Sequence, residues 1–357
     1  MEVPYNLADS GVAPVVLREL VPTPEAVQAL LEVDLHYPAV NGTEDLRRLI
    51  AGLYPGVGPA QVLVTVGAAE ANALCVATLT APGDHVVVLE PGYRQVAGMA
   101  ANNGCEVDSF HLVESDGWRP DLDELERVVR PDTRLIAVSN PNNPTGAILT
   151  PDEVSRILAV AERVGAWVLA DEVYRGSEMD RDEETPTLVG QYDRLVVTNS
   201  LSKAYGLSGL RLGWVAGPQQ VVDDMWRRHE YATISTSKLS MHLAQIALSE
   251  PCRSELFRRN RAFIRKGWAR LQAWVESTDG LVTAIKPEAT ALAFLRYDLD
   301  LPSLEVAHAL RRGGVLVGVG AHFGVEHHLR VTHGLAAEYM EPALERMTGV
   351  FSALRAG

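Results

Sequence analysis

The sequence predicts an α/β protein whose large domain holds a mostly parallel sheet sandwiched by helices. Two observations predict this fold: short apolar runs recur from about residue 60 to 215, and segments with helical spacing lie between them. Strands that are apolar on both faces and alternate with helices are typical of parallel sheets covered on both sides. A change of character after residue 250 predicts a smaller α/β domain.

Six runs have the composition of buried strands, at residues 61–67, 85–91, 134–140, 167–173, 194–200 and 210–217. Helices are predicted between them at 70–79, 122–129 and 151–165 from apolar spacing. The acidic, turn-rich stretch SEMDRDEETPTL (177–188) is predicted to be a solvated loop. Residues 254–277 space their apolar side chains like one face of a long helix, and we expect its arginines on a solvated face.

These elements predict two domains. The large domain is expected to span residues 37–250, and the small domain to combine residues 1–36 with 251–357. The first ~35 residues have too little periodicity to fold alone, so we expect them to pack with the C-terminal part.

The composition of the chain indicates which classes of partner and which cellular location to expect. The net charge of −14 disfavours nucleic acid, because phosphate-binding proteins carry basic stripes. Three widely spaced cysteines form no CxxC pair, which fits a reducing cytoplasm and no zinc site. The N-terminus lacks the features of a signal peptide and no apolar run approaches a membrane span, so a cytoplasmic protein without a membrane partner is expected.

The unusual residues follow the predicted strands, at the carboxyl edge where open parallel sheets bind ligands. The first of these strands ends in Gly67, and Ala68 and Ala69 then open a helix whose free N–H groups suit an anion. Later strand ends bring an aromatic ring, amides, a carboxylate, hydroxyls and an amine to the same edge: Tyr93, Asn142, Asn143, Asp171, Ser200, Ser202 and Lys203, with Arg211 beyond.

Lys203 lies in SLSKAYGLSGLRLGW (200–214), far from other charges except Arg211. A loop lysine with its ammonium in water is one interpretation, and a lysine held for chemistry is the other. A ligand that needs an amine, a buried carboxylate, an amide, an aromatic face and a phosphate pocket together is pyridoxal 5′-phosphate (PLP). This combination predicts that Lys203 forms a Schiff base with PLP.

Three motifs, NPNNPTG, DEVY and SLSKxxxxxGLRLGW, occur in an order and spacing that resemble the class I/II aminotransferases of fold-type-I PLP enzymes, over about residues 36–334. The resemblance implies that the large-domain sheet is of their seven-stranded type. The resemblance implies that Lys203 carries the cofactor and moves the Cα proton, while Asp171 pairs with the pyridine nitrogen. It also implies further cofactor contacts: Asn143 and Tyr174 on the ring hydroxyl, Tyr93 on the ring face, and Gly67, Ala68, Ala69, Ser200 and Arg211 at the phosphate.

The resemblance extends to the substrate and to a second subunit. Arg330 matches the arginine that binds the substrate α-carboxylate, and Gly11 is a further candidate there. Tyr37 matches the tyrosine that reaches the neighbouring subunit's phosphate, so a homodimer with shared active sites is implied. Residues 230–237 match a segment that also crosses to the partner's cofactor.

Two functions are weighed. The first is amino-group transfer from an α-amino acid to a 2-oxo acid through pyridoxamine phosphate. The second is a PLP-dependent lyase, cyclase or decarboxylating-deaminating enzyme. It is suggested by the histidine-bearing C-terminal loop and by LADSGVAPVVLREL, which together with SKAYGLSGLRLGW resembles capreomycidine-synthase-like PLP enzymes of natural-product pathways. Four C-terminal histidines match no metal-site spacing, so no metal is expected, and a substrate-side role stays open for the first and last of them: His322, His327, His328 and His333.

Overall fold

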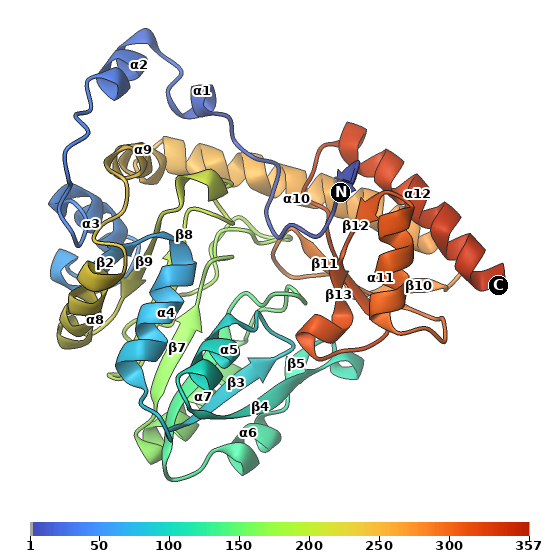
Figure 1. Cartoon of the computed structure of the whole chain (residues 1–357), viewed down its shortest axis with the longest axis horizontal. Helices are drawn as coiled ribbons and strands as arrows, with labels where there is room; N and C mark the ends of the chain where they lie inside the picture. The colour runs from blue at the N-terminus through green and yellow to red at the C-terminus, as the bar shows by residue number, and fades with distance from the viewer. Residues whose placement is uncertain (1–2, 357) are drawn as a thin grey trace.

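A computed structural model describes residues 3–356 of the chain and confirms the predicted fold class (Figure 1). Its central sheet has eight strands, not seven, because a two-residue strand pairs at one edge. In order across the sheet they are β2 (Val62–Thr65), β9 (Gly213–Ala216), β8 (Leu195–Ser200), β7 (Trp167–Asp171), β6 (Thr133–Ser139), β3 (His85–Glu90), β4 (Glu106–Val113) and β5 (Arg119–Pro120).

Both faces of this sheet are buried, as the continuous apolar runs predict. Along β2, Val62 and Val64 belong to one apolar core while Leu63 between them belongs to another. This alternation follows from the two-residue period of a strand. Helices that contribute to the core with Leu63 are α4 (Gly67–Leu79), α5 (Gln95–Asn102) and α8 (Gln219–Ala232). The opposite core includes α3 (Glu44–Ala51), α6 (Leu122–Val128), α7 (Pro151–Val164) and α9 (Lys238–Leu248).

The strand directions explain where a site forms. Pairs β3–β4, β3–β6, β6–β7 and β7–β8 are parallel, whereas β9 runs antiparallel to both β8 and β2. Strand β2 therefore points the same way as β8. The carboxyl ends of β2, β3, β6, β7 and β8 all reach one edge of the sheet, together with the amino end of β9.

The C-terminal part builds a second apolar core on an antiparallel sheet of four strands. These are β10 (Val282–Ala284), β11 (Leu292–Tyr297), β14 (His328–Thr332) and β13 (Gly318–Val319). They are packed by α10 (Cys252–Glu276), α11 (Ser303–Arg312) and α12 (Ala337–Ala356). Four 3-10 turns complete the chain at η1 (Pro59–Gln61), η2 (Glu114–Asp116), η3 (Ser208–Leu210) and η4 (Gly320–Phe323).

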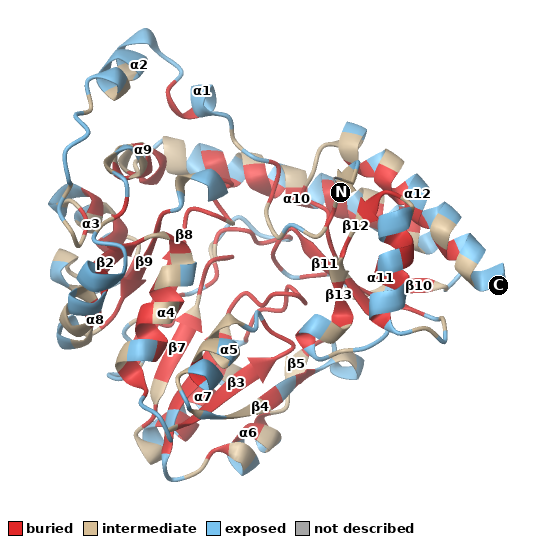
Figure 2. Cartoon of the chain, in the orientation of Figure 1, coloured by how far each residue is buried: buried red, intermediate tan, exposed pale blue. Residues whose placement is uncertain are grey.

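The N-terminal residues take an extended path over both parts. Strand β1 (Tyr5–Asn6) pairs in parallel with β12 (Val315–Leu316). The chain then crosses toward the large sheet and forms an arm that contains α1 (Leu17–Leu20) and α2 (Pro24–Leu31) (Figure 1). Figure 2 shows that this arm is mostly exposed, and α2 buries none of its residues.

Within the described residues, no helix is both long and apolar enough to cross a membrane.

Candidate active site

Asp171 is the last residue of β7, at the carboxyl edge of the large sheet. Its Oδ2 accepts a hydrogen bond from Asn72 Nδ2 at 3.1 Å, and its Oδ1 accepts one from the Val173 N–H at 3.2 Å. Burial raises the pKa of Asp171, while these two hydrogen bonds and the charge of Lys203 oppose the rise. Asn72 is itself fixed, because Thr198 Oγ1 donates to its Oδ1 at 2.7 Å. The site therefore holds an oriented carboxylate, to which no cation among residues 3–356 is directly bonded.

Lys203 follows β8 by three residues and is a half-buried amine, not a lysine in water. Burial lowers the pKa of Lys203 to about 8, with the positive charge of Arg330 adding to the effect and Asp171 opposing it. Its Nζ donates to Ser10 Oγ at 2.5 Å. An amine with this pKa is partly unprotonated near neutral pH, which a nucleophilic lysine requires.

Arg330 lies in the middle of β14, a strand of the smaller sheet, and reaches the site from that sheet. Its Nη1 donates to Asn143 Oδ1 at 3.0 Å and its Nη2 to the Ala8 carbonyl at 2.5 Å. The buried Nε has no hydrogen-bond partner in the part of the chain that the structure describes, and the guanidinium lies 5.1 Å above the Phe323 ring. Burial lowers the pKa of this guanidinium. An arginine with an unpaired buried N–H can gain a further acceptor, such as a carboxylate.

The start of α4 forms a narrow cradle beside Arg211. The helix begins at Gly67, one residue earlier than predicted, because the chain turns there with a φ of +75°. A Cβ at Gly67 would lie only 2.6 Å from Arg211 Nη2, so only glycine leaves this space open. Ser202 accepts from Arg211 Nη1 at 3.4 Å, and Ser202 N–H donates to Ser200 Oγ at 3.2 Å. N–H groups, hydroxyls and a guanidinium thus converge as an anion site requires.

Three further predicted site residues are Tyr174 and Tyr93, expected at the cofactor ring, and Gly11, expected near the substrate. Tyr174 is buried, its hydroxyl donates to the Ser10 carbonyl at 3.2 Å, and burial raises its pKa to about 12. Ala68 packs against the small apolar cluster of Val173, Tyr174 and Leu292. Tyr93 lines a small cavity with Asp171 and is half exposed. Gly11 lies in the N-terminal segment, where its carbonyl accepts from Thr332 Oγ1 at 2.9 Å.

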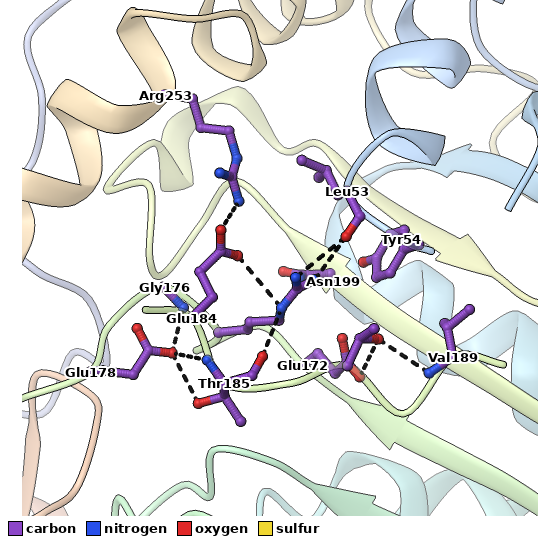
Figure 3. Close-up of polar contacts among 12 residues, drawn as sticks. Leu53, Tyr54, Glu172, Gly176, Glu178, Glu184, Thr185, Val189, Asn199 and Arg253 are labelled. Atoms are coloured by element: carbon purple, nitrogen blue, oxygen red, sulfur yellow. Dashed lines mark hydrogen bonds and ion pairs between the residues drawn. The ribbon is translucent and has the colours of Figure 1, made fainter. Parts of the chain in front are cut away.

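A buried polar network surrounds Glu172, the residue that follows Asp171 at the end of β7 (Figure 3). Glu172 accepts from Thr187 Oγ1 at 2.9 Å, and burial raises its pKa to about 7. Glu178 accepts from the Thr185 N–H at 2.7 Å. The prediction of a solvated loop at 177–188 is therefore wrong for its inward-facing residues, because Glu178 is fully buried and needs these partners.

The same network corrects the interpretation of two arginines in α10, whereas Arg258 and Arg265 are exposed as expected. Arg261 is buried and donates to Glu178 Oε2 at 2.6 Å. Arg253 donates to Glu184 Oε1 at 2.5 Å, as Figure 3 shows. These arginines are not on a solvated face, since their charges pair with acidic residues that the loop turns inward.

A second buried cluster connects the start of α4 to two other segments. His229 is fully buried, with Nδ1 2.9 Å from Glu70 Oε1 and Nε2 3.1 Å from the Val40 carbonyl. Thr233 Oγ1 donates to the same Glu70 oxygen at 2.5 Å, and Glu70 Oε2 accepts from Val66 N–H at 2.6 Å. Both ring nitrogens therefore face oxygen acceptors, a carboxylate on one side and a backbone carbonyl on the other. The cluster ties the α4 N-terminus to the segments after Tyr37 and around 230–237.

Tyr37 itself does not join the site within one chain. It is 72% exposed, and Tyr231 in the 230–237 segment is 93% exposed. The C-terminal histidines also lie apart: His322 and His327 are exposed, while His328 is buried against Glu114 with Nε2 at 3.1 Å. His333 is fully buried beside Trp268, and burial lowers its pKa to about 4. Across residues 3–356, no three metal-binding side chains gather in a suitable group.

Sequence reasoning missed Asn72, Ser10 and the Glu70–His229 pair. Asn72 gave a usable signal, because a polar residue in the apolar helical stretch EANALCVATL needs a partner when buried. Glu70 in the first turn of a helix gave another. Ser10 gave none, since nothing in its neighbourhood specifies a contact with a residue 193 positions away.

The arrangement fits PLP. Gly67 and Arg211 leave a cradle for a phosphate, Lys203 offers an amine of lowered pKa for the aldehyde, and Asp171 offers a buried carboxylate for a ring nitrogen. Arg330 retains an unpaired N–H on the substrate side.

Comparisons with known proteins agree with this chemistry. The family described as aminotransferase class I and II matches residues 16–347. Capreomycidine synthase of Streptomyces vinaceus is 32% identical over 295 residues, covering 81% of this chain and 74% of that protein. Aromatic-amino-acid aminotransferase 2 of Thermococcus litoralis is 28% identical over 341 residues, covering 91% and 86%. The crystal structure of a PLP-dependent aminotransferase from Streptococcus suis superposes with a TM-score of 0.92 at 33% identity, covering 99% of this chain and 94% of that one. The chain therefore belongs to the class I and II aminotransferase family of PLP-dependent transferases.

Proposed function

We propose that this aminotransferase binds PLP at the carboxyl edge of the large sheet and uses Lys203, Asp171 and Arg330 to move an amino group from an α-amino acid to a 2-oxo acid. When bound, PLP supplies an aldehyde that links to amines and a ring that withdraws electrons from the substrate's Cα–H bond. The single observation that carries the proposal is the buried Lys203 amine, of lowered pKa, in one site with the Asp171 carboxylate.

Each residue has a distinct task in this proposal. Lys203 would attach the cofactor and then, as a free amine, take the proton from Cα. The Asp171 carboxylate would hold a proton on the pyridine nitrogen. Arg330 would bind the substrate α-carboxylate as a fork, with Asn143 fixing its orientation through the 3.0 Å hydrogen bond. Gly11 would lie near that carboxylate.

The remaining cofactor contacts are proposed from the same geometry. The α4 N-terminus at Ala68 and Ala69, together with Ser200 and Arg211, would hold the phosphate through N–H, hydroxyl and guanidinium donors. Asn143 and Tyr174 would reach the ring hydroxyl. Tyr93 would cover the ring, since it lines the cavity that also contains Asp171.

We further propose a homodimer in which Tyr37 and residues 230–237 complete the partner's phosphate site. Exposed apolar side chains support this, because they gather on the arm and around the C-terminal end of α8. They are Val27, Leu31, Leu35, Tyr37, Tyr231 and Ile234. We also propose that residues 37–250 form one domain and residues 1–36 with 251–357 the other. A cytoplasmic location is proposed from the three free cysteines.

The shared site has a complementation test. Lys203→Ala removes the amine of its own chain, and Tyr37→Ala removes the hydroxyl supplied to the other chain. Mixed dimers of the two variants would then contain one site with both native residues, so tight PLP binding should return to half of the sites. No recovery on mixing would show that Tyr37 acts within its own chain.

A second candidate function is a lyase, cyclase or decarboxylating-deaminating reaction of a natural-product pathway. The similarity to capreomycidine synthase supports it. A single turnover with amino acids and no oxo acid separates the two. Stable conversion of the cofactor to its amine form, with one equivalent of 2-oxo acid, supports amino transfer. Return of the yellow cofactor with ammonia, carbon dioxide or a cyclised product supports the second candidate.

A further inference from the structure

An extended segment of the N-terminus, residues 6–14, crosses directly over the proposed catalytic lysine. We call it the N-terminal strap. Its Ala8 carbonyl accepts from Arg330, its Ser10 hydroxyl accepts from Lys203, and its Ser10 carbonyl accepts from Tyr174. Asp9 lies between the two residues that make these contacts. The strap thus places the exposed Asp9 on the stretch of chain between its contact with the proposed carboxylate-binding arginine and its contact with the proposed cofactor lysine.

Asp9 and Lys203 line the same cleft, whose volume is about 560 Å³. Among the described residues that line it, these two alone carry charge at neutral pH. The negative charge of Asp9 acts on both Lys203 and Arg330. Once Lys203 is attached to a cofactor its ammonium charge is no longer available to pair with Asp9. The cleft would then keep one unpaired carboxylate.

The rest of the cleft wall combines an apolar stretch with polar groups. Val12 and Leu335 supply apolar surface, whereas Asn6 and Tyr339 place polar side chains on the same lining. Tyr339 is also anchored to the strap, because its hydroxyl accepts from the Asn6 N–H at 2.6 Å. A ligand with an aliphatic stem and a cationic end would satisfy both the apolar wall and the carboxylate.

We propose that Asp9 is a specificity-determining residue that selects amino acids with an aliphatic side chain ending in a cation, of the ornithine, lysine and arginine class. The inference rests on the proposed function, since Arg330 must bind the α-carboxylate for the side chain to extend into this cleft. An acidic side chain would meet repulsion from Asp9, and a neutral one would leave the carboxylate unpaired.

The experiment uses the PLP-loaded enzyme and its Asp9→Asn variant. Dissociation constants are measured by spectral titration with α-methylornithine and with α-methylnorleucine, which lack a Cα hydrogen and cannot be turned over. Rates of the first half-reaction are then measured for L-arginine, L-citrulline and L-glutamate. Citrulline matches arginine in shape without its charge. Asp116→Asn is the matched control, because Asp116 is an exposed aspartate in η2.

Asp9→Asn should weaken α-methylornithine binding and slow the arginine reaction by about tenfold, as expected for losing a partly shielded charge pair. Binding of α-methylnorleucine and the citrulline rate should stay within about twofold. Equal losses for charged and neutral ligands, or a wild-type preference for glutamate or citrulline, would overturn the inference. If no amino acid changed the cofactor spectrum, the proposed function would fail instead, so the two failures are distinguishable.

Discussion

Replacing Asn72 with alanine tests how the proposed site keeps Asp171 ionised. The substitution removes the 3.1 Å hydrogen bond from Asn72 Nδ2 and leaves the Val173 N–H as the remaining donor to this carboxylate. A hydrogen bond to a charged group contributes about 1.5–3 kcal/mol. Burial already raises the pKa of Asp171, and losing the donor raises it further.

The sign of the effect on stability follows from proton binding. An acid whose pKa is higher in the folded than in the unfolded protein binds more protons when folded, so the free energy of unfolding falls as the pH rises through that range. Asn72→Ala should therefore destabilise the protein more at pH 8.5 than at pH 6, by at most the about 1.5–3 kcal/mol of that hydrogen bond. The cavity left by the side chain lowers the free energy of unfolding equally at both pH values, so its effect cancels when the two losses are subtracted.

Urea unfolding of the cofactor-free protein at pH 6 and pH 8.5 measures this difference, and both values avoid the isoelectric point near 5.2. Gln95→Ala is a control, because Gln95 Oε1 accepts from the same amide at 3.3 Å without contacting Asp171. In a protein that already carries Asp171→Asn, the loss of unfolding free energy caused by Asn72→Ala should be the same at both pH values. An equal loss for Asn72→Ala at both pH values would refute the reasoning.

Three other outcomes are expected. The rate at which the cofactor-free protein captures PLP should rise with pH and level off above about pH 8, because burial lowers the pKa of Lys203 to about 8; a rise continuing to pH 10 would contradict this. Arg330→Lys should raise KM for amino acids by about tenfold or more, since an ammonium cannot replace the fork, while PLP affinity stays unchanged. His229→Gln should weaken PLP binding and dimer assembly together, because His229 ties the α4 N-terminus to the segment after Tyr37; if assembly changed without PLP affinity, the coupling would be disproved.

The sequence allowed the carboxyl-edge residues to be predicted because a parallel sheet places consecutive strand ends side by side. Asp171, Lys203 and Asn143 each follow a recognisable apolar run, so their gathering at one edge needs only the strand order. The fold class, the family and the cofactor are confirmed. The roles of the individual side chains stay predictions until they are measured.

The contacts of the N-terminal strap could not be predicted, because its residues have no periodicity that specifies a path. Ser10 meets Lys203 across 193 positions and Ala8 meets Arg330 across 322. The inward turn of Glu178 was missed for a related reason. An acidic, turn-rich composition is typical of solvated loops, and here the distant Arg261 pairs with the loop's carboxylate and makes burial possible.

Chemical trapping of the cofactor tests the central claim most directly. The chain has four lysines, Lys203, Lys238, Lys266 and Lys286, so borohydride reduction of the PLP-loaded protein followed by peptide mass mapping can locate the attachment. The account predicts one reduced PLP per chain on the peptide that contains Lys203, and none after competition with excess amino acid substrate. Attachment at Lys238, Lys266 or Lys286 with Lys203 unmodified would contradict it.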